Sequence, residues 1–91
     1  MSSLDEVYEQ MRLFQRALVE FNEEIHASTA ALEQSHQETI ALWRDEAAQR
    51  YLQTYEPLAK SLEDYLRGSA PRFERFLENK LGHLERYLHG G

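Results

Sequence analysis

The chain has 91 residues, with 10 Lys and Arg against 16 Asp and Glu, which gives a formal net charge of -6. A chain of this length forms one domain, residues 1–91, near the lower limit for a single hydrophobic core. Its acidity argues against nucleic acid or an anionic membrane surface as the principal ligand. The sequence contains no cysteine, which excludes disulfides and thiolate metal sites.

Apolar residues in the N-terminal segment recur at alternating spacings of three and four. This pattern is a heptad seam and predicts an amphipathic helix over residues 4–40, about 50 Å long. Ser3 followed by Glu6 has the form of a capping box at its start. The seam residues expected to form the core or an interface are Leu4, Val7, Met11, Phe14, Leu18, Phe21, Ile25 and Leu32.

A turn over residues 41–45 and a second helix over residues 46–67 are expected next. Asp45 suits the N-cap of that helix, because its carboxylate can accept a backbone N–H of the first turn. Pro57 predicts a kink rather than an end, since the seam stays in phase on both sides of it. The second seam contains Tyr55, Leu58, Leu62 and Tyr65, preceded by Ala48 and Tyr51.

The segment Arg67–Pro71 reads as a break, followed by a third helix over residues 70–88 and a frayed end at His89–Gly91. One face of the third helix is apolar. The predicted fold is therefore all-α: an antiparallel helical hairpin with a C-terminal third helix. The apolar face of that helix would carry Phe73, Phe76, Leu77, Leu81, Leu84, Tyr87 and Leu88.

These lengths also predict assembly. A compact domain of this size has a radius of gyration of roughly 12 Å, and such a body cannot enclose a helix near 50 Å long. Two long helices in a hairpin leave part of each apolar stripe open to water. We therefore expect two hairpins to pair as a four-helix bundle, the partner being a second copy or a related hairpin.

The stretch Leu42–Tyr51 places Trp43 at the end of the first helix and Ala47 and Tyr51 on the second. This arrangement resembles the turn of the W-x-G family, the small helical-hairpin proteins of bacterial type VII (ESX-type) secretion systems. In that family a Trp ends the first helix, a Gly two residues later makes the turn, and an Ala and an aromatic residue follow. The resemblance covers residues 4–66. It implies a homodimer or heterodimer that serves as secretion substrate or chaperone-like partner, with a secretion ATPase as a further partner.

The chain departs from that family at two points. Asp45 stands in the place of the motif Gly, where it can still cap the following helix. The family's C-terminal signal, a Tyr followed four residues later by Asp or Glu, is not matched: Ser69 follows Tyr65 and Gly91 follows Tyr87. The N-terminus lacks the basic and apolar regions of a Sec signal peptide, and no apolar run could insert stably into a membrane. We expect a bacterial cytoplasmic protein, or one exported without a Sec signal.

Two Glu-x-x-His pairs, Glu23 with His26 and Glu33 with His36, have the spacing used by helical di-iron sites. The seam places the first pair on the outer face and the second at its margin, and the pairs lie about 15 Å apart. We therefore expect no metal, no cofactor and no catalytic residue. A homo-oligomeric coiled-coil adaptor unrelated to secretion is the alternative function, and a ferritin-like di-iron protein is a remote third.

Overall fold

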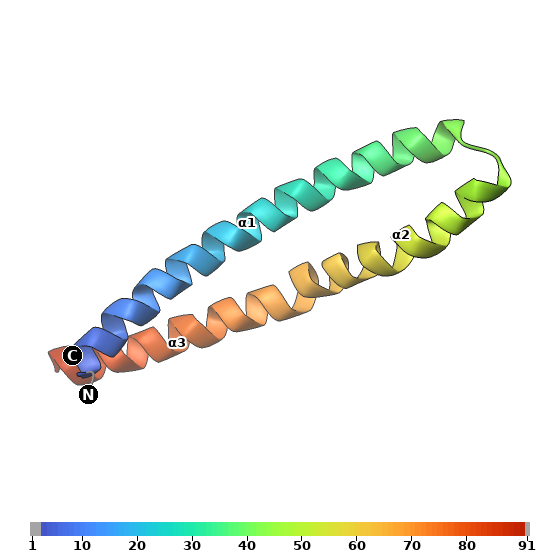
Figure 1. The fold of residues 1–91 in the computed structure, drawn as a ribbon. Helices are drawn as coiled ribbons and strands as arrows, with labels where there is room; N and C mark the ends of the chain where they lie inside the picture. Colours follow the sequence, from blue (N-terminus) through green and yellow to red (C-terminus); the bar gives the residue numbers. More distant parts are fainter. Residues whose placement is uncertain (1–2, 91) are drawn as a thin grey trace.

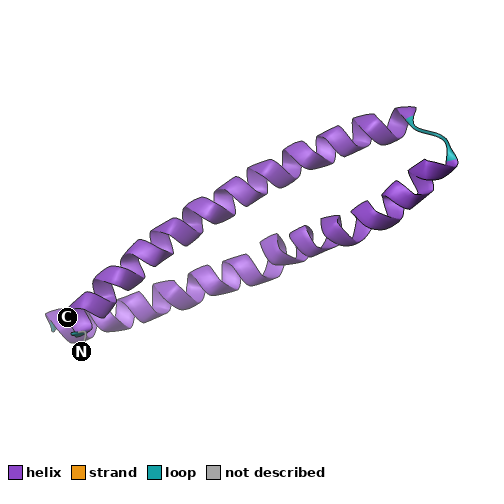
Figure 2. Cartoon of the chain, in the orientation of Figure 1, coloured by secondary structure: helices purple, strands orange, loops and turns teal. Residues whose placement is uncertain are grey.

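The computed structural model describes residues 3–90, which form one elongated helical hairpin with both chain ends at the same end (Figure 1). Figure 2 shows two helical arms joined by a short loop, and residues 3–90 contain no strand. The predicted all-α hairpin is confirmed. The first arm is α1 (Leu4–Leu42), and the second arm runs through α2 (Glu46–Asp64), the π-helical turn η1 (Tyr65–Ser69) and α3 (Ala70–His89).

Helix α1 begins where its cap predicts. The Ser3 hydroxyl oxygen accepts a hydrogen bond from the backbone N–H of Glu6 at 3.2 Å. Asp5 and Glu6 then place negative charge in the first turn, where the helix dipole favours it. The helix continues to Leu42, two residues beyond its expected end, because no Gly or Pro interrupts the segment. Trp43 then leaves the helix with extended backbone angles.

The expected break at Arg67–Pro71 is wrong, and so is a third helix separated from the second. The chain instead continues through η1, where the backbone N–H of Ala70 donates to the carbonyl of Tyr65, five residues earlier. Pro71 has no N–H to donate, and this wider turn accommodates the chain immediately before it. Helix α2 likewise continues through Pro57, as its seam predicts.

Helix α3 ends at a glycine in the left-handed conformation. His89 is helical, contrary to the expected fraying, and Gly90 follows with φ of 64°. A glycine at this position adopts the left-handed backbone without the steric cost of a Cβ atom. Gly91 lies outside the described residues, as do Met1 and Ser2.

The hairpin has little interior. Its radius of gyration is 19.8 Å and its extents are 65 × 23 × 17 Å, far from the roughly 12 Å radius of a compact domain of this length. Within residues 3–90, four apolar side chains are buried, two of them alanines, together with two polar side chains. None of the helices in this range combines the length and apolar composition needed to cross a membrane. The buried residues are Ala48, Ala70, Leu77, Leu81, Asn22 and His36.

The face of α1 that meets the second arm lies one residue later in the heptad than the predicted seam. Met11, Leu18 and Ile25 are half-buried, as expected. The other seam row, Val7, Phe14 and Phe21, is 39–50% exposed, and Asn22 and His36 are buried in the neighbouring row. Leu4, Leu32 and Leu58 are also 42–50% exposed. In a four-helix bundle three neighbouring helices would surround α1, whereas in the single hairpin only the second arm contacts it. The second arm therefore covers one side of the apolar stripe, and hydrogen-bonded polar residues complete the contact between the arms.

Candidate functional site

The loop at the hairpin tip is fastened by one carboxylate. Oδ1 of Asp45 accepts the backbone N–H of Ala48 at 3.2 Å, which confirms the predicted N-cap. The same oxygen accepts the indole N–H of Trp43 at 2.6 Å. A single side chain thus joins the residue that ends α1 to the first turn of α2. Glycine, the residue of the W-x-G motif, could form neither of these side-chain bonds.

Aromatic rings fill the space between the arms next to this loop. The ring centre of Trp43 lies 5.3 Å from that of Tyr51. The His36 ring contacts both Tyr51 and Tyr55: it is stacked on Tyr55 at 3.9 Å, and its Nδ1 is 2.8 Å from the Tyr51 hydroxyl. The motif residues Trp43, Asp45 and Tyr51 are therefore brought together, while Ala47 is half-buried on the first turn of α2. The arrangement makes the tip an aromatic cluster of Trp43, Tyr51, His36 and Tyr55.

On the side away from the loop, the last residue of the cluster, Tyr55, forms a hydrogen bond between the two arms. The Tyr55 hydroxyl donates to a carboxylate oxygen of Glu33 at 2.7 Å, and the Gln37 side chain donates to the other oxygen at 2.8 Å. These bonds, the Tyr55 one above all, lower the pKa of Glu33 below its ordinary value of 4.5. The bond to Glu33, aided by desolvation, raises the pKa of Tyr55 to about 12. At neutral pH the carboxylate is therefore ionised and the phenol is protonated, so the phenol can donate its proton to the hydrogen bond and the carboxylate can accept it.

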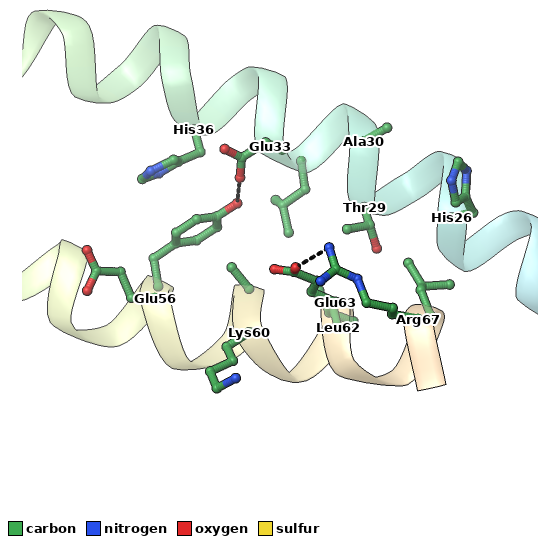
Figure 3. Close-up of a pocket in the computed structure, with 14 residues that line it drawn as sticks. His26, Thr29, Ala30, Glu33, His36, Glu56, Lys60, Leu62, Glu63 and Arg67 are labelled. Atoms are coloured by element: carbon green, nitrogen blue, oxygen red, sulfur yellow. Dashed lines mark hydrogen bonds and ion pairs between the residues drawn. The ribbon is translucent and has the colours of Figure 1, made fainter. Parts of the chain in front are cut away.

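An open groove of about 880 Å³ lies beside the cluster, between α1 and α2 (Figure 3). Aliphatic side chains, among them Leu32 and Leu62, form part of its wall. Two cations of its lining form ion pairs along the second arm, Arg67 with Glu63 at 2.7 Å and Lys60 with Asp64 at 3.4 Å, and His26 and Glu56 also line the groove. The groove has the character of a surface for apolar side chains.

A second polar cluster crosses the arms at η1. Asn22 is 6% exposed, and its amide donates to Glu74 at 2.6 Å. Its side-chain oxygen accepts the Tyr65 hydroxyl at 2.5 Å. Asn22 on α1 is thereby bonded to Tyr65, the first residue of the π turn, and to Glu74 on α3. Such a buried, satisfied amide fixes how the arms align along their length.

A continuous set of aliphatic and aromatic side chains remains open to solvent on one side of the hairpin. Val7, Phe14 and Phe21 are seven residues apart and share one face of α1. Phe14 contacts Phe73 with ring centres 5.8 Å apart, which places the corresponding row of α3 beside them. Exposure ranges from 39% to 76% across this surface, named here the apolar face. It consists of Leu4, Val7, Phe14, Phe21, Phe73 and Tyr87.

The Glu-x-x-His pairs do not converge. Glu23 and His26 are exposed on α1, as the seam predicts. His36 is buried at 8% exposure rather than marginal, and both it and Glu33 are bonded to tyrosines of α2. Within residues 3–90, no three His, Asp or Glu side chains lie close enough together to hold a metal ion.

Two interior residues, Asn22 and His36, were missed by reasoning from the sequence. Both are polar: Asn22 lies one position after the seam residue Phe21, and His36 lies one position after Ser35, which continues the same heptad row without an apolar side chain. Their fourteen-residue separation, two heptads, was the available signal, but a hydrophobicity pattern assigns no weight to a polar row. Their bonding partners lie on the other arm, 15 to 52 residues away in sequence.

Comparison with known proteins adds no relative. No protein-family model, no curated protein and no solved structure matches this chain.

Proposed function

We propose that this chain is a W-x-G-like helical-hairpin protein associated with a bacterial type VII secretion system. It acts without catalysis, through helix–helix pairing, as a secreted substrate or a chaperone-like partner. The observation that carries the proposal is the apolar face: aromatic and aliphatic side chains in heptad register, 39–76% exposed, along a hairpin with almost no interior. Large contiguous apolar surfaces of this kind mark protein–protein interaction sites.

Energetics support association. Burying a large apolar side chain completely contributes about 1.5–3 kcal/mol, so covering a half-exposed Phe adds roughly 1 kcal/mol. Phe14 and Phe21 are each 50% exposed, and Phe73 is 45% exposed. A partner that covers these three and their neighbours gains several kcal/mol before the cost of association. The hairpin alone leaves that stabilisation unused.

The Trp turn supports the family part of the proposal. Trp43 follows the end of α1, and Tyr51 packs against it from the second turn of α2, at the positions where the W-x-G motif has its Trp and its aromatic residue. Asp45 replaces the motif Gly and ties the same loop by hydrogen bonds. The turn thus keeps the geometry of a hairpin while using different chemistry at one position.

Export is the test of the secretion role. The protein, expressed in a bacterium that carries a type VII system, is followed in the culture medium with and without the secretion ATPase. ATPase-dependent appearance in the medium, or ATPase-dependent export of a hairpin protein that copurifies with it, supports the proposal. If neither occurs, the coiled-coil adaptor becomes the better reading. That alternative is favoured by one observation: Ser69 and Gly91 stand where the family's export signal requires an acid.

A further inference from the structure

The two long edges of the hairpin carry opposite charge. Each edge is the side of one arm that points away from the other arm (Figure 1). On α3 this is the side opposite the buried Leu77 and Leu81, and no acidic residue of α3 lies there, although the chain has a net charge of -6. This surface, named here the basic edge, consists of Arg72, Arg75, Asn79, Gly82 and Arg86.

The arginines of the basic edge have no carboxylate partner within residues 3–90. Arg72 donates to the backbone carbonyl of Gly68 at 3.2 Å, and Arg75 and Arg86 are exposed. A guanidinium group presents several N–H donors in one plane, an arrangement that suits a carboxylate. The basic edge therefore fits a surface that holds carboxylates at a fixed spacing.

The corresponding edge of α1 is acidic. It is the side opposite the buried Asn22, and its two heptad rows contain no basic residue. Leu13 lies on this side at 54% exposure, pointing away from the second arm. This surface, named here the acidic edge, consists of Glu6, Gln10, Leu13, Ala17, Glu20 and Glu24.

The charges on the two edges match in spacing and in level. Glu6 and Glu20 are fourteen residues apart, and so are Arg72 and Arg86. Tyr8 lines the same cleft as Arg86, so Glu6, two residues before Tyr8, lies near the level of Arg86 along the hairpin. Because the arms are antiparallel and the spacings are equal, Glu20 then lies near the level of Arg72.

A second hairpin placed beside the first, in the same plane and with its tip pointing the same way, brings its acidic edge against this basic edge. Both pairs of charges then meet at once, and Leu13 comes to lie beside Asn79 and Gly82. A Cβ atom at Gly82 would meet only the Arg86 guanidinium, at 3.8 Å, so the surface there can receive a large side chain. Turning the second hairpin so that like edges meet would oppose like charges, which costs free energy.

We infer that copies of this chain associate edge to edge, the acidic edge of one on the basic edge of the next. The contact is heterologous and leaves one edge free at each end, so association continues beyond two copies as an open array. Exposed ion pairs each contribute little, so the contact is weak and largely dissociated at micromolar concentration. This inference goes beyond the proposed function, because it uses neither the apolar face nor the Trp turn.

Glutamine substitutions test the heterologous contact. One variant, Glu6→Gln with Glu20→Gln, loses the charges of the acidic edge, and another, Arg72→Gln with Arg86→Gln, loses those of the basic edge. Neither should associate through its edges alone. An equimolar mixture should form pairs through the one intact edge of each chain, and these pairs should not grow further. A mixture whose average mass does not exceed that of its separate components would overturn the contact.

Cross-linking tests the geometry, because the chain has no native cysteine. Gln10→Cys on the acidic edge and Gly82→Cys on the basic edge are prepared as separate chains, mixed, and treated with a short bis-maleimide. We expect a linked dimer from the mixture and little from either chain alone. Efficient linking of either chain to itself would place like edges together and exclude the proposed arrangement.

One substitution should strengthen the contact. Arg16 precedes Ala17 at the margin of the acidic edge, where it meets Arg75 of the next copy as a like charge. Arg16→Glu replaces this repulsion by an attraction and should lower the Kd of the edge contact by about fivefold. The matched control, Arg44→Glu, makes the same change of net charge in the tip loop and should not tighten association. If both variants weaken association equally, net charge rather than the edges controls it, and the inference fails.

Salt separates this contact from association through the apolar face. The Debye length falls from about 10 Å at 0.1 M salt to about 3 Å at 1 M, which weakens contacts between exposed charges but not the burial of apolar surface. The average mass of the wild type, measured by sedimentation at about 1 mM protein, should exceed twice 10.7 kDa at the lower salt concentration and fall at the higher one. A mass that is independent of salt would count against the edge contact, whereas the secretion role is decided separately by ATPase-dependent export.

Discussion

The indole N–H of Trp43 donates a hydrogen bond to Oδ1 of Asp45 at 2.6 Å, across the only non-helical segment between the arms. That oxygen is also the N-cap of α2. One carboxylate therefore sets both the direction in which the chain leaves α1 and the start of α2. The loop of three residues is held by side-chain bonds rather than by the backbone freedom of a glycine.

Replacement of Asp45 should show this double role. Asp45→Ala removes the cap and the indole's acceptor, and we expect a loss of about 1–2 kcal/mol in the free energy of unfolding. Asp45→Asn keeps an oxygen in place and should cost less. Asp45→Gly, though it restores the motif residue, should also destabilise, because it too loses the Trp43 bond. Urea denaturation followed by Trp43 fluorescence measures all three, and a neutral Asp45→Ala would contradict the role of the carboxylate.

The two histidines of α1 provide a matched pair. His36 is buried against two tyrosines, so His36→Ala should cost about 2 kcal/mol through lost stacking and an unpaired Tyr51 hydroxyl. His26 is exposed, and His26→Ala should change stability by less than about 0.5 kcal/mol. Thermal unfolding of both variants, with and without added zinc or iron, gives the comparison. A metal-induced rise in Tm that is lost in these variants would speak for a metal site instead.

Asn22 should behave as an alignment residue. Asn22→Ala leaves the Tyr65 hydroxyl and Glu74 without their partner, and we expect a loss of about 1–3 kcal/mol. Asn22→Leu replaces the amide by an apolar side chain of similar size and should restore part of that stability while relaxing the register. Denaturation midpoints measure the first effect. Broadened amide resonances around η1, compared with the wild type, measure the second.

The Tyr55–Glu33 bond should make stability depend on pH at both ends of the scale. The pKa of Tyr55, raised to about 12 from 10.0, means that its contribution is complete below about pH 10 and is lost as pH rises toward 12. The lowered pKa of Glu33 means that its contribution is complete above its ordinary 4.5 and is lost as pH falls below it. The difference in Tm between the wild type and Tyr55→Phe should therefore be widest at about pH 6–9. A constant difference across the scale would rule out this bond as its source.

Association should depend on the apolar face and not on exposed apolar side chains in general. Phe21→Asp places a charge within the face and should abolish pairing at a cost of several kcal/mol. Leu42→Asp is the control: Leu42 is 87% exposed at the tip, away from the apolar face. Light scattering should give at least twice 10.7 kDa for the wild type and for Leu42→Asp, and the monomer mass for Phe21→Asp. Equal masses for the two variants would remove the face as the site of association.

Local signals in the sequence predicted the local parts of this structure. Ser3 and Asp45 carry the side chains that cap helices, and both caps are confirmed because a cap depends on residues within one turn. The break before Pro71 was predicted wrongly because the prediction considered only the local effect of proline. Proline forbids an α-helical bond at its own nitrogen, but the sequence does not reveal that a π turn will absorb the defect.

The side of α1 that meets the second arm could not be predicted from hydrophobicity. Phe14 and Phe21 define the strongest apolar row, yet the hairpin buries the neighbouring row that holds Asn22 and His36. The choice depends on bonds to Tyr65, Glu74 and Tyr51, which come together only in the folded hairpin. The sequence thus predicted an apolar seam that is partly open to water, but it did not predict which row of that seam the hairpin leaves exposed.

The π turn at Tyr65–Ser69 has a consequence for the evolution of this chain's length. Each residue of a helix is rotated by about 100° from the one before, so deleting a single residue in η1 would turn all of α3 about its axis relative to α2. Leu77 and Leu81 would rotate away from α1, and Phe73 and Tyr87 would leave the apolar face together. Length changes should therefore be tolerated at the tip loop and selected against here, unless a second insertion or deletion in the same arm restores the phase.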